Sequence, residues 1–247
     1  LNYKILEGLT FNVMTGVDLR GMNEQKFRPK LPAFLNDVAY GSDSALFDFN
    51  WLAEFTFNYV KSFGKHHLTG LAGYTTQRDY YKANYLYSDK FSNNLVPTLS
   101  ATSGIITNGT STLNEWSILS YLGRVNYNFD GKYYVTASIR ADGSSRFGSD
   151  RKYGIFPSAA VAWRISDENF LKDVKQISEL KLRGSFGVTG NNNIGNYDHI
   201  ATINYENYAL GGVAAGGYAP ARIANTLLTW ETQRQFNVGL DISLFDH

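Results

Sequence analysis

Residues 132–140 read K-Y-Y-V-T-A-S-I-R, and their side chains alternate between polar and apolar. The apolar set is Tyr133, Val135, Ala137 and Ile139, and the polar set is Tyr134, Thr136, Ser138 and Arg140. Because successive side chains of a β-strand point to opposite faces, this period of two predicts a strand with one face in an apolar medium and one in water. The apolar medium is either a protein core or lipid, and the choice between them decides the function.

The same alternation recurs along the chain and predicts about eight antiparallel strands. They lie at residues 9–20, 51–59, 68–74, 119–129, 132–140, 153–164, 180–189 and 230–244. Short turns join two of the pairs at 63–66 and 129–132, and Asp-Gly in the second turn is a strong hairpin signal. The stretches of about 76–115 and 191–225 are rich in Asn, Ser, Thr, Gly and Tyr, which is typical of long surface loops. Pro157 lies within a strand, and its missing N–H predicts a local bulge.

The composition excludes several classes of protein. No run approaches the roughly 18 consecutive apolar residues of a membrane helix, so a helical membrane protein is excluded. The 23 basic and 22 acidic residues nearly cancel and form no basic stripe, so we expect no nucleic-acid partner. Without cysteine the chain has no disulfide, thiolate metal site or thiol catalysis, while the cellular compartment stays open.

Three features favour lipid over a protein core. The expected strands have about 9 to 12 residues, which crosses a bilayer at a tilt, whereas strands of soluble sheets have about 5 to 6 residues. Aromatic residues gather near both ends of the strands, as in the interfacial girdles of membrane barrels. Short and long connections alternate, as they do between the two sides of such a barrel. Half-buried soluble sheets show the same alternation, so a soluble β-sandwich is the alternative.

Several stretches stand out between residues 116 and 246. They are G-R-V-N-Y (123–127), S-I-R-A-D-G-S-S-R-F-G (138–148), F-P-S (156–158), A-W-R-I-S (162–166), L-K-L-R-G-S-F-G-V-T-G-N (180–191), W-E (230–231) and N-V-G-L-D (237–241). In this order they resemble SusC/RagA-type TonB-dependent transporters of the Gram-negative outer membrane. Residues 1–115 agree with that family more in strand rhythm than in identity.

The resemblance implies a fold, a location and partners. In this family a barrel of about 22 strands encloses an N-terminal plug, and a TonB-box segment contacts the energy-coupling protein TonB. A SusD-like lipoprotein closes the outer mouth over an oligosaccharide or peptide ligand. Residue 1 is Leu rather than Met, and neither plug nor TonB box is recognisable. We therefore expect residues 1–247 to be a partial transmembrane β-barrel domain within a longer chain, in contact with outer-membrane lipid, with short periplasmic turns and long extracellular loops.

Two sets of residues are candidates for a role in such a barrel. The lumen-facing charges, expected to form structural salt bridges along the wall or with the plug, are Glu54, Arg124, Arg140, Arg164, Lys181, Arg183 and Asp241. The candidate ligand or partner contacts on the long loops are Tyr80, Tyr81, Tyr85, Tyr87, Tyr205, Tyr208 and Tyr218. Aromatic rings stack on sugars and anchor protein interfaces, and stabilising the loops themselves is the alternative role of these tyrosines.

The segment Asp142–Ser149 is expected to be a turn scaffold rather than a ligand contact, because Gly, Ser and Asp in loops usually serve the turn. Glycines 143 and 148 suit positive backbone φ angles. Arg140 or Arg146 is placed to pair with Asp142 or Asp150.

No pattern supports catalysis, a cofactor or a metal. His66 and His67 point to opposite faces of a strand and do not share one ion. The stretch G-S-F-G at 184–187 lacks the spacing of a nucleophile elbow, and the glycines at 211–217 lack the βαβ context of a phosphate site. We therefore expect a non-enzymatic importer. The alternatives are a passive outer-membrane β-barrel with a structural or adhesive role, and a soluble glycan-binding β-sandwich.

Overall fold

The structure is a computed structural model that describes residues 1–31, 37–102, 104–171 and 174–245. Within these ranges the strands are β1 (Asn2–Leu6), β2 (Leu9–Arg28), β3 (Tyr40–Phe63), β4 (His66–Ser88), β5 (Asn108–Phe129), β6 (Tyr133–Ser144), β7 (Tyr153–Arg164), β8 (Ile177–Asn191), β9 (Thr202–Leu210), β10 (Val213–Arg222) and β11 (Glu231–Leu244). Three short 3-10 helices are η1 (Leu99–Thr102), η2 (Ser149–Arg151) and η3 (Ile165–Asp167). Among the described residues, no helix is long and apolar enough to cross a membrane.

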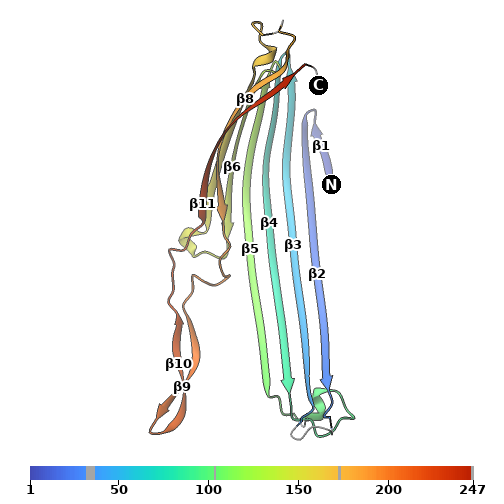
Figure 1. The fold of residues 1–247 in the computed structure, drawn as a ribbon, viewed down its shortest axis with the longest axis vertical. Coiled ribbons are helices and arrows are strands. Elements are labelled where there is room, and N and C mark those ends of the chain that lie inside the picture. The colour runs from blue at the N-terminus through green and yellow to red at the C-terminus, as the bar shows by residue number, and fades with distance from the viewer. Residues whose placement is uncertain (32–36, 103, 172–173, 246–247) are drawn as a thin grey trace. The chain divides into compact units, whose positions relative to one another are not determined.

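Nine strands form one sheet in the order β1-β2-β3-β4-β5-β6-β7-β8-β11, and β9 and β10 form a separate hairpin (Figure 1). Sheet neighbours are consecutive along the chain except for β11, because the β9–β10 hairpin is inserted after β8. The ladders β1–β2, β5–β6, β6–β7, β7–β8 and β8–β11 are antiparallel. The predicted all-β antiparallel barrel segment is confirmed, with an open sheet.

The chain divides into two compact units. Unit 1 comprises residues 1–15, 53–76 and 117–247, and unit 2 comprises residues 16–52 and 77–116. Unit 1 contains the short turns, the ladders from β5 to β11 and the β9–β10 hairpin. Strands β2 to β5 each contribute one part to unit 1 and one part to unit 2.

The expected number of strands and the expected loops are wrong in part. Strands β1, β9 and β10 consist almost entirely of exposed residues, so an alternation of buried apolar positions does not mark them. Strands β2 to β5 have 20 to 24 residues rather than 9 to 12. The predicted loop of about 76–115 therefore shrinks to residues 89–107, because polar and aromatic residues on both faces extend β4 and β5. The predicted loop of about 191–225 contains the β9–β10 hairpin.

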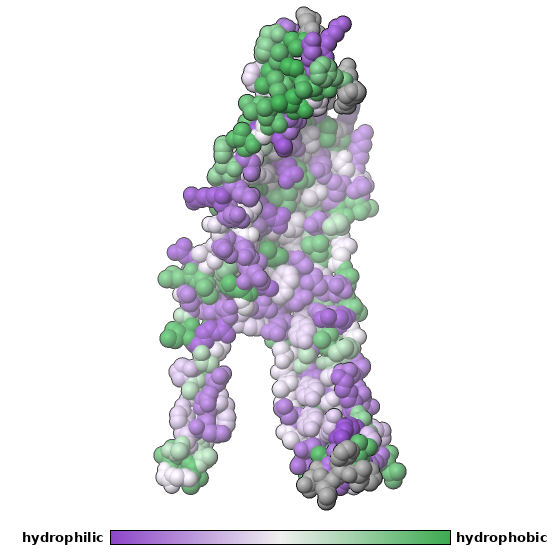
Figure 2. Space-filling view, in the orientation of Figure 1, coloured by the Kyte–Doolittle hydropathy of each residue, from purple (hydrophilic) through white to green (hydrophobic). Residues whose placement is uncertain are grey.

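The strand register places the apolar side chains of five strands on one face of unit 1. Tyr133 pairs with Phe129 in β5 and with Trp163 in β7, Trp163 pairs with Leu182 in β8, and Leu182 pairs with Leu240 in β11. Leu182 is 41% exposed and Leu240 54%. No second sheet covers this face within the described residues, as a β-sandwich would require, and an uncovered apolar face is what a lipid-facing wall needs. In Figure 2 hydrophobic residues of unit 1 gather near the end with the short turns.

An aromatic belt crosses the same end of the sheet, beside the short turns. The ring centroids of Phe63 and His66 are 4.9 Å apart, and those of His66 and Phe129 are 4.8 Å apart. Phe129 lies 6.3 Å from Tyr133, which lies 6.4 Å from Trp163. The aromatic residues expected as an interfacial girdle thus form a continuous row from β3 to β7.

The short turn between β5 and β6 has the predicted hairpin geometry. Asp130 and Gly131 both have positive φ, at 55° and 68°, as an Asp-Gly type I′ turn requires. The N–H of Lys132 donates to the carbonyl of Phe129 at 3.0 Å. The Lys65 ammonium of the β3–β4 turn lies 2.7 Å from the Asp130 carboxylate, and its hydrogen bond lowers the pKa of Asp130. Two neighbouring turns are therefore joined by one ion pair.

Pro157 produces no bulge in the β6–β7 ladder, contrary to the sequence prediction. It pairs with Ile139 in unbroken register. The N–H of Arg164 donates to the carbonyl of Lys132 across from β6, so alternation turns the nitrogen of Pro157 toward β8. The β7–β8 ladder begins only at Ser158, so the missing N–H costs no ladder hydrogen bond.

A small core cluster lies where the connections from β6 and from β10 enter β7 and β11. It consists of Phe147, Phe156 and Trp230, which are 1%, 7% and 8% exposed. The Phe156 and Trp230 ring centroids are 5.2 Å apart, and Nε1 of Trp230 donates to the carbonyl of Lys152 at 2.9 Å. This cluster anchors the connections to β7 and β11.

Candidate functional site

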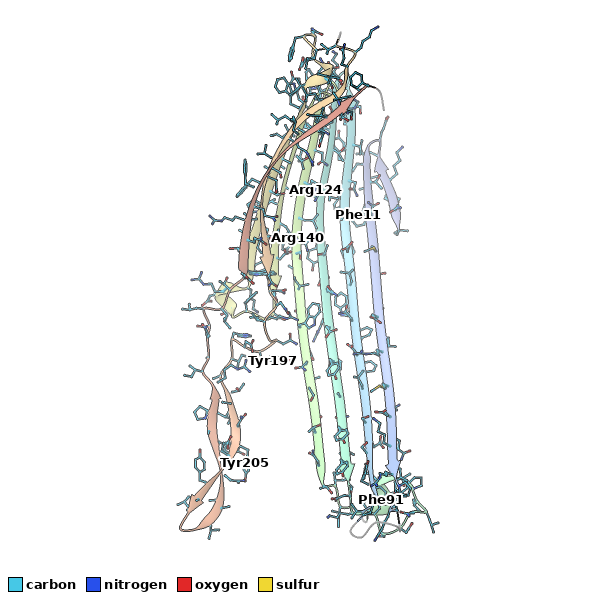
Figure 3. The ribbon with its side chains drawn as sticks, in the orientation of Figure 1. Phe11, Phe91, Arg124, Arg140, Tyr197 and Tyr205 are labelled. Carbon is cyan, nitrogen blue, oxygen red and sulfur yellow. The ribbon has the colours of Figure 1, made fainter. Side chains whose placement is uncertain are left out.

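The polar face of the unit 1 sheet carries the charges that the sequence analysis selected. Arg124 pairs with Ser138, which precedes Arg140 by two residues on the same face. Arg164 pairs with Lys181, and Lys181 pairs with Asp241. Glu54 is two residues from Thr56 in β3, and Arg183 is two residues from Lys181 in β8, so strand alternation puts both charges on this face. Figure 3 labels Arg124 and Arg140. The strand register therefore brings all seven charged residues to the face opposite the apolar one.

Most of these charges are paired within the wall. Arg183 lies 3.2 Å from Asp241, on the neighbouring strand. Arg164 lies 3.5 Å from Asp167 in η3. Arg140 lies 2.7 Å from Asp142, which is one of the pairs that the sequence allowed. Among the described residues, Glu54, Arg124 and Lys181 lie on this face without a salt bridge.

A depression of about 410 Å³ opens on the polar face across β6, β7, β8 and β11. Small residues form much of its lining, including Ala160, Ala162 and Gly239, with the longer side chains of Lys181 and Arg183 beside them. The ammonium of Lys181 lies 5.2 Å from the centre of the Tyr134 ring, which is a cation–π contact. The depression therefore presents cationic and aromatic groups together.

The segment Asp142–Ser149 makes several hydrogen bonds to neighbouring segments. The N–H of Ser117 donates to Oγ of Ser145 at 2.8 Å, and the N–H of Ser145 donates to the carbonyl of Ser117 at 2.9 Å. Arg146 donates from Nε to Oδ1 of Asn196 at 3.0 Å and from Nη1 to the carbonyl of Asn192 at 3.1 Å. The segment thus holds the start of the β8–β9 connection in place.

The reason for the glycines in this segment differs from the predicted one. Neither Gly143 nor Gly148 has a positive φ. A Cβ atom on Gly143 would lie 2.6 Å from the ring of Tyr153, and one on Gly148 would lie 3.2 Å from the carbonyl oxygen of Thr226. Close approach of neighbouring groups, rather than backbone conformation, requires glycine here.

The first four candidate tyrosines do not lie on a loop. Tyr80, Tyr81, Tyr85 and Tyr87 belong to β4, where alternation puts Tyr80 on the face opposite the other three. Tyr80 lies 6.3 Å from Phe47 in β3, measured between ring centroids. The long strands of unit 2 therefore present these rings from a regular sheet.

The other three candidates lie on the β9–β10 hairpin. Tyr205 and Tyr208 are in β9 and Tyr218 is in β10, with exposures of 63%, 46% and 70%. Tyr205 pairs with Tyr218 in the ladder, and their rings meet edge to face at 5.9 Å (Tyr205 is labelled in Figure 3). An ion pair between Arg222 and Asp198 holds the base of the hairpin. The hairpin presents a two-ring surface to solvent.

Sequence reasoning missed Glu168, which follows η3 at the short-turn end. Its Oε1 accepts hydrogen bonds from the Tyr133 hydroxyl at 2.5 Å and from Nε1 of Trp163 at 3.1 Å, and its Oε2 lies 3.5 Å from the ammonium of Lys132. These bonds, led by the one from Tyr133, lower the pKa of Glu168. A carboxylate a few residues after Trp163, the penultimate residue of β7, was the available signal. No cluster of His, Cys, Asp and Glu with metal-ligand geometry occurs in the described part of the chain.

Antiparallel strands with an uncovered apolar face, an aromatic belt and a polar face of paired charges define a segment of a transmembrane β-barrel. The family described as "TonB dependent receptor-like, beta-barrel" matches residues 4–247. The chain belongs to this family.

Individual relatives agree with this assignment. TonB-dependent receptor P39 of Formosa agariphila is 38% identical over 248 residues, which cover 99% of this chain and 24% of the relative. TonB-dependent receptor SusC of Bacteroides thetaiotaomicron is 41% identical over 135 residues, 53% of this chain and 13% of SusC. The RagAB peptide transporter structure superposes with a TM-score of 0.88 at 30% identity, covering 99% of this chain and 27% of that chain. The chain thus spans about a quarter of the length of the first of these relatives and of the RagAB chain.

Proposed function

We propose that the chain is part of the barrel of a TonB-dependent transporter in the outer membrane of a Gram-negative bacterium. The transporter imports oligosaccharide or peptide ligands with a SusD-like lipoprotein, and it contacts TonB through a segment outside residues 1–247. The two-faced wall carries the proposal, because an uncovered apolar face backed by a polar face suits a barrel that separates lipid from a wet interior. The peptide ligand draws on the likeness to the RagAB peptide transporter, and the oligosaccharide on the resemblance to SusC/RagA-type transporters.

The polar wall suits passage rather than chemistry. Conduction requires that a ligand bind strongly enough to enter and weakly enough to leave. Pairing Arg140 with Asp142 and Arg183 with Asp241 reduces the field that single charges present to a passing ligand. No covalent change of the ligand is part of this proposal, and the chain is not an enzyme.

Two groups of tyrosines are the proposed contacts for ligand or lipoprotein. On the β9–β10 hairpin they are Tyr205, Tyr208 and Tyr218, and on the unit 2 part of β4 they are Tyr80, Tyr81, Tyr85 and Tyr87. The hairpin pair is the stronger candidate, because both rings are more than 60% exposed and already ordered by edge-to-face contact. Ordered aromatic rings bind with little loss of entropy.

Energised uptake is the test of this function. The full-length gene is expressed in its host, and cells receive fluorescent pools of oligosaccharides and of peptides. Uptake is measured with and without a protonophore, and in a strain that lacks TonB. We expect surface binding to persist and accumulation to stop in both treatments. Accumulation that continues without the proton-motive force contradicts an energised importer and favours a passive barrel.

A further inference from the structure

A groove of about 540 Å³ lies on the apolar face of unit 1. Its floor is made of small residues on three adjacent strands, namely Gly70 and Ala72 in β4, Gly123 in β5 and Ala137 in β6. Larger side chains of the same face line its sides, namely Leu9, Phe57, Tyr59, Val125 and Ile139. Leu71, Arg124 and Ser138 complete the lining, and alternation turns their side chains to the polar face. The groove is therefore apolar on the side that faces outward.

The protein itself does not need glycine at the floor of this groove. A Cβ atom on Gly70 would lie 3.9 Å from the Cβ of Tyr59, and one on Gly123 would lie 3.8 Å from a methyl carbon of Ile139. Both are ordinary van der Waals distances, and neither glycine has a positive φ. Glycine inside a strand weakens the strand. Contacts within the chain therefore give no reason for glycine at these two positions.

Two other glycines of unit 1, Gly154 and Gly190, show a contrast. Cβ atoms on Gly154 and Gly190 would lie 2.4 and 2.1 Å from the Phe156 ring, so that this ring already fills the space above them. Above Gly70 and Gly123 no protein group occupies the corresponding space. The occupant of the groove therefore comes from outside the described chain.

The position of the groove indicates the chemistry of its occupant. The floor residues lie about six residues from the short turns at 64–65 and 130–131, roughly 20 Å along the strands at about 3.3 Å per residue. A strand tilt of about 45° turns this into about 14 Å along the membrane normal, near the middle of an apolar band about 25 Å tall. At that depth the surrounding molecules are lipid acyl chains, and headgroups lie beyond reach.

One side of the groove, at Phe57, is held by ring packing. The ring centroids of Phe57 and Phe11 are 4.8 Å apart, and Phe11 lies 6.5 Å from Phe55 (Phe11 is labelled in Figure 3). Phe55 lies 6.1 Å from Tyr74, which lies 5.5 Å from Tyr121. The contact with Phe11 therefore holds the Phe57 side of the groove in place, and the row of rings continues beyond the groove.

We propose that this groove is a specific seat for one acyl chain of a membrane phospholipid. The groove is continuous with the lipid-facing wall, it is apolar, and its depth matches the acyl region. Dispersion contacts with the floor and sides hold the chain more firmly than the flat parts of the same face do. The proposal rests on the transmembrane fold and not on the transported ligand, so it and the proposed import function fail separately.

Photochemical labelling of the full-length protein tests the proposal. The protein is reconstituted in vesicles of phosphatidylethanolamine that contains a small fraction of lipid with a diazirine in mid-acyl chain. After irradiation, mass spectrometry maps the labelled residues. We expect labelling at Phe57, Tyr59 and Ile139 to exceed labelling at Phe236 and Leu240, which lie on the same face outside the groove, by about tenfold, equivalent to about 1.4 kcal/mol.

Filling the groove gives the decisive comparison. Gly123→Leu and Ala72→Leu should each reduce labelling of the groove residues to the level of Phe236. Ala72 is exposed, so its replacement leaves the strand pairing intact. The matched control is Gly184→Leu, which places the same side chain on the same face of β8, where the nearest neighbouring atom is 3.9 Å from the new Cβ. It should leave labelling of the groove unchanged. Heat-modifiable gel mobility confirms that each barrel is folded.

Three results would overturn the proposal. One is even labelling along the whole apolar face of the unaltered protein, which indicates a general lipid annulus. Another is groove labelling that survives both filling substitutions. The third is cross-linking of the groove residues to a protein, either a second copy of the chain or the lipoprotein partner, in place of lipid.

Discussion

Nε of Arg140 donates to Oδ1 of Asp142 at 2.7 Å, and the same guanidinium donates from Nη2 to Oγ of Ser120 at 2.9 Å. Asp142 is 7% exposed and Ser120 is 0% exposed, whereas the Arg140 side chain is 46% exposed. One half-exposed cation therefore satisfies two acceptors that water hardly reaches. This arrangement ties β5 to β6 where the scaffold segment 142–149 begins.

Replacing Arg140 with Ala should lower the free energy of unfolding by about 1–2 kcal/mol, because it leaves a buried carboxylate without its charged donor. Urea unfolding of the full-length barrel in detergent measures the change. In the double variant R140A/D142N the loss should be smaller than in R140A, since the unpaired charge is gone. An R140A variant as stable as the parent would show that water replaces the guanidinium.

Replacing Phe156 with Ala should be the most destabilising of these changes. The ring is 7% exposed, packs against Trp230 and fills the space above Gly154 and Gly190. Its loss leaves a cavity that a rigid sheet does not close, which typically costs about 3–5 kcal/mol. The same unfolding assay measures it, with Phe236→Ala, 73% exposed on the lipid-facing side, as the control. A similar loss in both variants contradicts a packed anchor at Phe156.

The Lys65–Asp130 pair should give a pH-dependent stability. The hydrogen bond from Lys65 lowers the pKa of Asp130 below its ordinary value of 3.8. A lowered carboxyl pKa adds stability above the unfolded-state pKa, and this is lost as pH falls through the folded-state value. The melting temperature of D130N should therefore lie below that of the parent at pH 7, and the gap should shrink as the pH falls below 3.8 and through the lowered pKa of Asp130. Asn tolerates the positive φ of this turn, and K65Q should show the same profile. A gap that persists in acid points to the turn backbone instead.

The sequence is sufficient for features that depend on near neighbours along the chain. Alternation over residues 133–139 predicted the two faces, because each side chain's face follows from its parity. The sequence also offered Arg140 with Asp142 as one of several possible ion pairs, and the structure contains this one. The turn at Asp130 follows from local backbone preference.

Features that depend on distant residues were missed for the same reason. Phe147 and Trp230 lie 5.4 Å apart in space, between ring centroids, and far apart in sequence, so no local pattern signals their contact. The strand of Tyr80 and Tyr81 was taken for a loop, because polar and aromatic residues on both faces hide the period of two. The sequence predicts a loop in place of the β9–β10 hairpin, because the turn residues Gly211 and Gly212 resemble part of a glycine-rich loop.

The exposed pair Tyr205 and Tyr218 allows function to be separated from stability. Tyr218→Ala removes the edge-to-face partner on a hairpin that contributes nothing to the buried core cluster, so stability should change by no more than about 0.5 kcal/mol. If the hairpin contacts ligand or lipoprotein, binding of the fluorescent ligand pool to whole cells should weaken by about 5- to 30-fold, as loss of about 1–2 kcal/mol predicts. Ala215→Ser, across from Tyr208 in the same ladder, is the control and should bind normally. Unchanged binding in both Tyr218→Ala and Tyr205→Ala would limit these rings to ordering the hairpin.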